Sequence, residues 1–145
     1  MERIVVGIDG SEGSRAALRW AIAEAAIRGA KVEAVSAFHV PYAAGTPMVP
    51  LMLDPEQFAE PARALVAKEL AEVADQAATL TEPISPLVIE GPASVVLIEA
   101  GRDASMIVVG ARGHGGLSGM LLGSVSRQVT EHATVPVVVV PKERS

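Results

Sequence analysis

Residues 106–133 read MIVVGARGHGGLSGMLLGSVSRQVTEHA. A short run of mainly β-branched residues, Met106 to Val109, opens this stretch, and a helical segment from Ser124 to about Ala133 closes it. Six of the chain's thirteen glycines fall between Gly110 and Gly123. A glycine cluster between a buried strand and a helix start lies where phosphate-binding loops lie in α/β proteins. The stretch therefore predicts a strand, an anion-binding loop and a helix, in that order.

Comparable apolar runs recur on either side of this stretch. They cover residues 4–8, 32–38 and 135–140, and a weaker run at 87–89 follows Pro83 and Pro86 and is predicted as an edge strand. Because strands alternate with helical segments, the pattern predicts an α/β fold with one doubly wound, open parallel sheet of five strands and helices on both faces. The expected strand order is 3-2-1-4-5, within a single domain over residues 1–145.

Helix signals fill the intervals between the strands. Ser11 is typical of an N-cap, and Gly29 of the end of the same helix. Asp54 followed by Pro55 also resembles a helix start, but Pro61 is expected to interrupt that helix, so the regular part is predicted from about Pro61 to Ala78. A shorter helix is predicted from Ser94 to about Arg102, and serines are expected to cap both of the later helices.

Composition narrows the classes of function. The formal net charge of −5 disfavours a nucleic-acid surface, and the absence of cysteine excludes disulfides and thiol chemistry. His39, His114 and His132 are scattered, which predicts no metal site made by the protein alone. No apolar run approaches the roughly 20 residues of a membrane span. The amino terminus is unlike a cleaved secretory signal, so we expect a cytoplasmic protein with no membrane partner.

Several better-known loops are absent. No Gly-Lys-Ser/Thr follows the glycines, and Ser118 breaks G-x-G-x-x-G, so neither a P-loop NTPase nor a dinucleotide dehydrogenase is indicated. The nucleophile elbow G-x-S-x-G is missing too. The loop could instead contact a ligand through its backbone. Gly110 would let a ligand sugar approach, and Gly113 would turn its amide inward with φ > 0. Ser124 and Ser126 supply hydroxyl groups at a helix start.

A second candidate site follows the first strand, in the segment Val6-Gly7-Ile8-Asp9-Gly10-Ser11. One interpretation is a helix-capping turn in which Asp9 and Ser11 accept hydrogen bonds from backbone amides. The other is a ligand site, because a doubly wound sheet that starts centrally brings the ends of its first and fourth strands together at the switch point. Both interpretations remain open on the sequence.

These segments resemble a known family. The spacing Gly110-x-x-Gly113, nine residues, Gly123-Ser124 is similar to the ATP-binding signature of the universal stress protein family. Residues 4–11 resemble that family's opening strand, and 135–140 its closing strand. The resemblance covers essentially the whole chain.

The resemblance implies an ATP site. It places Asp9 beside the ribose and phosphates, with Mg or Mn as a possible bridging ion, and Ala37 against the adenine. It assigns the ribose to Gly110, and the phosphates to Arg112 and Gly113. The residues that it implies at the nucleotide are Gly7, Ile8, Asp9, Ala37, Val109, Gly110, Arg112, Gly113, Gly123, Ser124, Val125 and Ser126.

The implied function is a nucleotide-dependent regulatory or stress-response switch with no catalytic residue. Two alternatives stay open: a slow ATP-hydrolysing or adenylyl-transferring enzyme, and a dimeric interaction module without nucleotide. Residues 135–141 hold a valine run on an expected edge strand, which predicts a homodimer that pairs through that strand. The proline-rich segment 41–55 is expected at the ligand-binding edge, either as a lid or as an ordinary loop.

Overall fold

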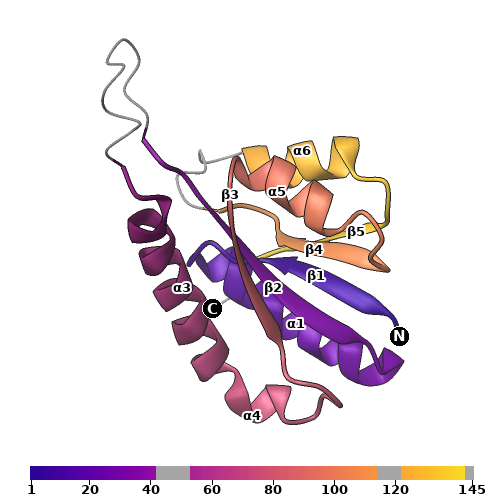
Figure 1. Ribbon diagram of the computed structural model, residues 1–145. Helices are drawn as coiled ribbons and strands as arrows, with labels where there is room; N and C mark the ends of the chain where they lie inside the picture. The colour runs from indigo at the N-terminus through magenta and orange to yellow at the C-terminus, as the bar shows by residue number, and fades with distance from the viewer. Residues whose placement is uncertain (42–52, 114–121, 143–145) are drawn as a thin grey trace.

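The computed structural model describes residues 1–41, 53–113 and 122–142. Most of the segment 41–55, together with His114 and Ser118, lies outside the described residues. The elements in chain order are β1 (Arg3–Gly7), α1 (Glu12–Arg28), β2 (Lys31–Phe38), α3 (Pro55–Glu72), α4 (Ala74–Ala77), β3 (Ser85–Glu90), α5 (Ala93–Ala100), β4 (Met106–Gly110), α6 (Ser124–His132) and β5 (Val137–Val140). Figure 1 shows these elements with their labels.

The strands form one five-stranded sheet in the order β3-β2-β1-β4-β5. Every neighbouring pair is parallel, and Val6 of β1 lies between Ala34 of β2 and Val108 of β4. The predicted fold class and strand order are therefore confirmed. β3 and β5 are the two edge strands, as the sequence predicts.

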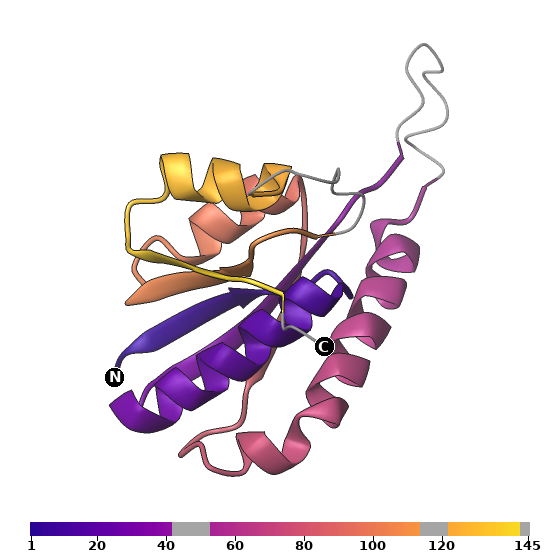
Figure 2. The ribbon, with the colours of Figure 1, turned by 180° about the vertical axis from the view of Figure 1, so that it is seen from behind.

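Helices cover both faces of the sheet (Figures 1 and 2). On one face, α1 and α3 pack over a core that includes Ile4, Val6 and Val66. On the other face, α5 and α6 pack over a second core that includes Val5 and Val129. Successive β1 residues thus enter opposite cores, which explains why the strand is apolar without alternation.

The ends of α1 follow the predicted signals. The Ser11 side chain accepts a hydrogen bond from the Ser14 amide, and Gly29 closes the helix with φ of 67°. The left-handed backbone conformation at this position favours glycine, because glycine has no Cβ atom. Ser11 thus fixes where α1 begins after β1, and Gly29 fixes where α1 ends before β2.

The prediction for the second helix is wrong. The helix α3 begins at Pro55 and passes through Pro61 without a break, whereas residues 74–77 form the separate short helix α4. The Asp54 side chain caps α3 by accepting from the Glu56 amide. Pro61 is exposed, so water can satisfy the carbonyl group that its missing N–H leaves unpaired.

The expected serine caps are also wrong. α5 begins at Ala93 after Pro92, and α6 begins at Ser124 after Gly123, and neither helix has a side-chain cap. The Ser94 hydroxyl instead donates to Gln128 Oε1 at 2.6 Å and joins the two helices. Tertiary packing of α5 against α6 therefore decides the role of this serine.

None of the described helices combines the length and the apolar character that crossing a bilayer requires.

Candidate functional site

The sheet order reverses between β1 and β4, because β2 lies on one side of β1 and β4 on the other. Connections leave these two strands toward opposite faces, and ligands of doubly wound folds bind at that point. A cavity of about 460 Å³ lies there, within the usual range of ligand pockets. The structure brings all the predicted site residues to its lining: Gly7, Ile8, Asp9, Ala37, Val109, Gly110, Arg112, Gly113, Gly123, Ser124, Val125 and Ser126.

Asp9 follows β1 after one intervening residue, Ile8, and its carboxylate is held by the turn that comes next. Its Oδ1 atom accepts from the Ser11 amide at 2.9 Å and from the Ser11 hydroxyl at 2.5 Å. Gly10 makes this turn possible with φ of 83°. Asp9 also lines the cavity and is exposed. The capping turn and the position at the site are thus compatible, since one side chain does both.

The first turn of α6 also lines the cavity. The capping residue is Gly123, whose amide donates to the Ala111 carbonyl oxygen at 2.7 Å. No side chain caps this helix, so the first-turn amides of Ser124 and Val125 are available to an anion. The Ser126 hydroxyl is different: it donates toward Ala111 O at 2.7 Å and Gly123 O at 3.1 Å, which braces the loop.

Gly110 has a packing role that was not predicted from the sequence. A Cβ atom built on this residue would lie 2.6 to 2.9 Å from backbone atoms of Gly13. A Cβ on Gly13 would in turn lie 2.4 Å from Arg112 O. The missing side chain at Gly110 therefore admits the start of α1, while its predicted contact with a ligand sugar stays a prediction. Gly110 lines the cavity through its backbone.

Gly113 also differs from the prediction. Among the described residues, positive φ occurs at Gly10, Gly29 and Gly91, so Gly113 does not adopt the expected left-handed backbone. A Cβ built on Gly113 would lie 2.3 Å from Asp9 Oδ2. Its lack of a side chain lets the Asp9 carboxylate sit against the loop after β4.

Sequence reasoning missed part of the lining. The additional residues are Ser11, Ser14, Val35, Ala93 and Leu97. Ser11 belongs to the predicted capping segment 6–11, whereas Ser14 lies three residues beyond it on α1 and was not singled out from the sequence. Ala93 and Leu97 come from α5, and only the packing of that helix against the sheet brings them to the cavity.

The cavity has an apolar part and a polar part. Val35, Ala37 and Leu97 contribute aliphatic surface, while Asp9 and Arg112 are the charged residues of its described lining. Among the described residues no cluster of three or more metal-ligating side chains exists. A cation at this site would therefore need ligands from a bound anion in addition to Asp9.

Comparison with known proteins identifies the chain. It matches the model of the universal stress protein family over residues 1–141. It belongs to this family. A universal stress protein of Mycolicibacterium smegmatis is 36% identical over 137 residues, which cover 94% of this chain and 45% of the relative. The chain thus spans less than half the length of that curated relative.

Solved structures of universal stress proteins share the fold. One, a complex with cAMP, is 27% identical with a TM-score of 0.66, and the match covers 98% of each chain. Another, from Lactobacillus plantarum, is 22% identical with a TM-score of 0.78 and covers 96% of this chain and 97% of its own. The second likeness concerns the fold alone, whereas the first neighbour also binds an adenine nucleotide.

Proposed function

We propose that this universal stress protein binds ATP, with a divalent cation, in the cavity between β1 and β4 and acts as a nucleotide-dependent regulatory switch. One observation carries the proposal: residues 7–9 line the same cavity as residues 109, 110, 112 and 113, about a hundred residues later, and as the uncapped helix start at residues 123–126. Uncapped first-turn amides favour phosphate groups. The solved relative in complex with cAMP supports an adenine nucleotide as the ligand.

The residues fit this ligand by their chemistry. The amides of Ser124 and Val125 would bind phosphate oxygens, and Arg112 would add a positive charge. The aliphatic surface of Val35 and Ala37 suits the face of a purine. Asp9 would repel a phosphate unless a cation lay between them, and Mg²⁺ or Mn²⁺ would supply that bridge.

Binding, rather than turnover, is the activity that the site supports. Hydrolysis of ATP needs a group that orients or deprotonates the attacking water. Asp9 is the acidic side chain of the described lining, and the Ser11 turn already occupies its Oδ1. We therefore propose a switch and not a catalyst.

We expect the purified protein to bind ATP at least about tenfold more tightly than GTP. The described wall at Val35 and Ala37 offers no acidic side chain to the 2-amino group of guanine, and an unpaired buried donor costs about that factor in affinity. Isothermal titration calorimetry with both nucleotides and Mg²⁺ measures the ratio. Equal affinities, or binding of neither nucleotide, would contradict the proposal.

The proposal includes a homodimer that pairs through β5. This strand bonds β4 on one side: Ile107 N donates to Pro136 O at 3.0 Å and Ala111 N donates to Val140 O at 2.8 Å. Backbone groups alternate in direction along a strand, so those of Val137 and Val139 face away from β4. All four valines of β5 are only half-buried. An apolar edge of this kind favours pairing with a second copy.

We expect a Val139→Pro variant to weaken the dimer at least tenfold. Proline removes the amide that faces the free edge, while the bonds between β4 and β5 stay intact. Val88→Pro on β3, the other edge strand, is a matched control. Gly91 N donates to Phe38 O of β2, so by the same alternation the Val88 amide faces away from β2. This proline therefore also removes an outward-facing amide, but at the other edge of the sheet. Sedimentation velocity at micromolar concentration measures the change. A monomeric wild-type protein, or equal dimerisation in both variants, would disprove pairing through β5.

A further inference from the structure

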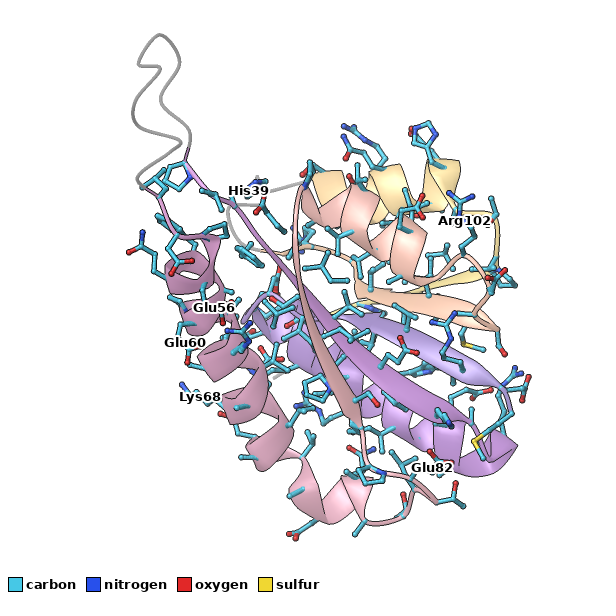
Figure 3. All side chains as sticks on the ribbon, viewed as in Figure 1. His39, Glu56, Glu60, Lys68, Glu82 and Arg102 are labelled. Carbon is cyan, nitrogen blue, oxygen red and sulfur yellow. The ribbon has the colours of Figure 1, made fainter. Side chains whose placement is uncertain are left out.

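Glu69 is a buried carboxyl group in a helix whose other acids point outward. Figure 3 shows Glu56 and Glu60 on the outer side of α3, where both pair with the exposed Arg63. Glu69 lies on the inner side and is only 2% exposed. Burying a carboxyl group is costly, so its partners decide what it does.

The partner of Glu69 is Ser14, on α1. The Ser14 hydroxyl oxygen lies 3.3 Å from Glu69 Oε1 and 3.5 Å from Oε2, and 3.2 Å from the Ser11 carbonyl oxygen. A hydroxyl group has one hydrogen and cannot donate to both residues at full strength. If Glu69 is protonated, its acid proton can go to Ser14 Oγ while Ser14 donates to Ser11 O. If Glu69 is ionised, Ser14 must turn its hydrogen toward the carboxylate.

The surroundings of Glu69 favour the protonated form. Burial raises the pKa of Glu69 above its usual value, the hydrogen bond from Ser14 and the charge of Arg15 oppose that rise, and the charges of Asp9 and Glu72 add to it. α3 also packs on β2 and β3. The charged residues of those strands are Lys31, Glu33 and Glu90, of which Lys31 pairs with Glu82 and Glu33 pairs with Arg3.

A continuous set of hydrogen bonds joins Glu69 to the cavity. Ser14 lines the cavity, and its amide donates to Ser11 Oγ at 3.1 Å. The Ser11 hydroxyl donates to Asp9 Oδ1 at 2.5 Å. The proton on Glu69 therefore decides which way the hydroxyl of Ser14 points, two hydrogen bonds away from the Asp9 carboxylate.

We propose that Glu69 is a positioning residue of the nucleotide site, which acts through Ser14 on the turn 9–14 and links nucleotide affinity to proton uptake. This inference rests on the proposed ATP site and adds a regulatory input from α3. In the protonated state Glu69 is neutral and the turn keeps its hydrogen bond from Ser14 to Ser11 O. In the ionised state a second negative charge lies behind Asp9, and the turn loses that bond.

The sign of the effect follows from charge. Bound phosphates are anionic, so they favour the neutral form of Glu69 and nucleotide binding takes up a proton. Affinity is therefore highest below the raised pKa of Glu69 and falls as pH rises through it. The ordinary pKa of a glutamate is about 4.3, so the fall begins above that value.

Calorimetry with ATP and Mg²⁺ between pH 5 and pH 8 tests the link in the wild-type protein and in Glu69→Gln. Glutamine keeps the shape and stays neutral, so the variant removes the titration and retains a bond to Ser14. Because ATP itself titrates, the measured quantity is the ratio of the two dissociation constants at each pH. We expect the wild-type dissociation constant to rise relative to that of Glu69→Gln as pH increases through the raised pKa of Glu69, by about tenfold in all, which corresponds to a pKa change of about one unit on binding.

Two further measurements separate a positioning role from a purely structural one. Titrations in buffers of different ionisation enthalpy report proton uptake, which we expect in the wild type and in smaller amount in both Glu69→Gln and Ser14→Ala. A ratio of dissociation constants that stays constant with pH, together with equal proton uptake in the three proteins, would overturn the inference while the ATP site stands.

The nucleotide-free protein distinguishes failure of the inference from failure of the ATP site. We expect the amide chemical shifts of Ser11 and Ser14 to follow the titration of Glu69 in the wild type and to show no such step in Glu69→Gln. Absence of that step in the wild type would disprove the coupling whatever the ligand. If the step is present but the protein binds no adenine nucleotide, the hydrogen-bond link from Glu69 to the turn stands. The ATP site and the proposed link between ATP affinity and proton uptake are then both wrong.

Discussion

A Gly110→Ala variant should lose about 3 kcal/mol of unfolding free energy, a large effect for a single methyl group. The new Cβ would lie 2.6 Å from the carbonyl carbon and 2.7 Å from the carbonyl oxygen of Gly13. These are backbone atoms in the first turn of α1, so they cannot rotate away as a side chain would. The helix must move off β4, on which it packs.

Urea denaturation measures this loss, and a double-mutant cycle with Gly13→Ala identifies its origin. A Cβ on Gly13 would lie 2.4 Å from Arg112 O, in the same contact between α1 and the end of β4. Once one alanine has separated the two segments, the second costs less, so the double variant should be less destabilised than the sum of the singles. Additive effects, or a Gly110→Ala protein as stable as the wild type, would show that this close approach is not required.

Gly113→Ala should lower ATP affinity about a hundredfold and leave the unfolding free energy within about 0.5 kcal/mol of the wild type. Its Cβ would lie 2.3 Å from Asp9 Oδ2. The carboxylate can rotate away, but it then gives up its two hydrogen bonds from Ser11 and the position that the proposed cation bridge needs. Gly113 itself is exposed, so the fold tolerates the methyl group.

Gly123→Ala is the matched control for Gly113→Ala. Both glycines line the same cavity, but a Cβ on Gly123 would have Arg112 Cα at 3.3 Å as its nearest neighbour and would not touch Asp9. We expect at most about a threefold loss of ATP affinity, because a shift of a few tenths of an ångström accommodates the methyl group. Calorimetry measures the ATP dissociation constants of both variants for this comparison. Unchanged ATP binding by Gly113→Ala would remove Asp9 from the nucleotide site.

Local patterns in the sequence determined much of this protein. The apolar runs of β1, β2 and β4 became buried central strands because each is short and rich in β-branched residues, and Ser11 and Gly29 ended α1 because capping depends on a few adjacent residues. Because strands and helices alternate, the sequence predicts a parallel doubly wound sheet. The switch point of that sheet brings Asp9 together with Gly110, Gly113 and Gly123 at the carboxyl ends of the strands. The location of the candidate site follows from such local rules.

Tertiary structure decided what the individual residues do. Gly110 is a glycine because the backbone of Gly13 passes within contact of it, and the two residues lie far apart in sequence. Glu69 is buried because α3 packs on β2 and β3 with this carboxyl group next to Ser14 of α1. Periodicity and turn chemistry describe neighbours along the chain, whereas close backbone contacts and buried charges depend on how distant segments pack. For that physical reason the position of the cavity could be predicted from the sequence, but the glycine contact and the buried carboxyl group behind the cavity could not.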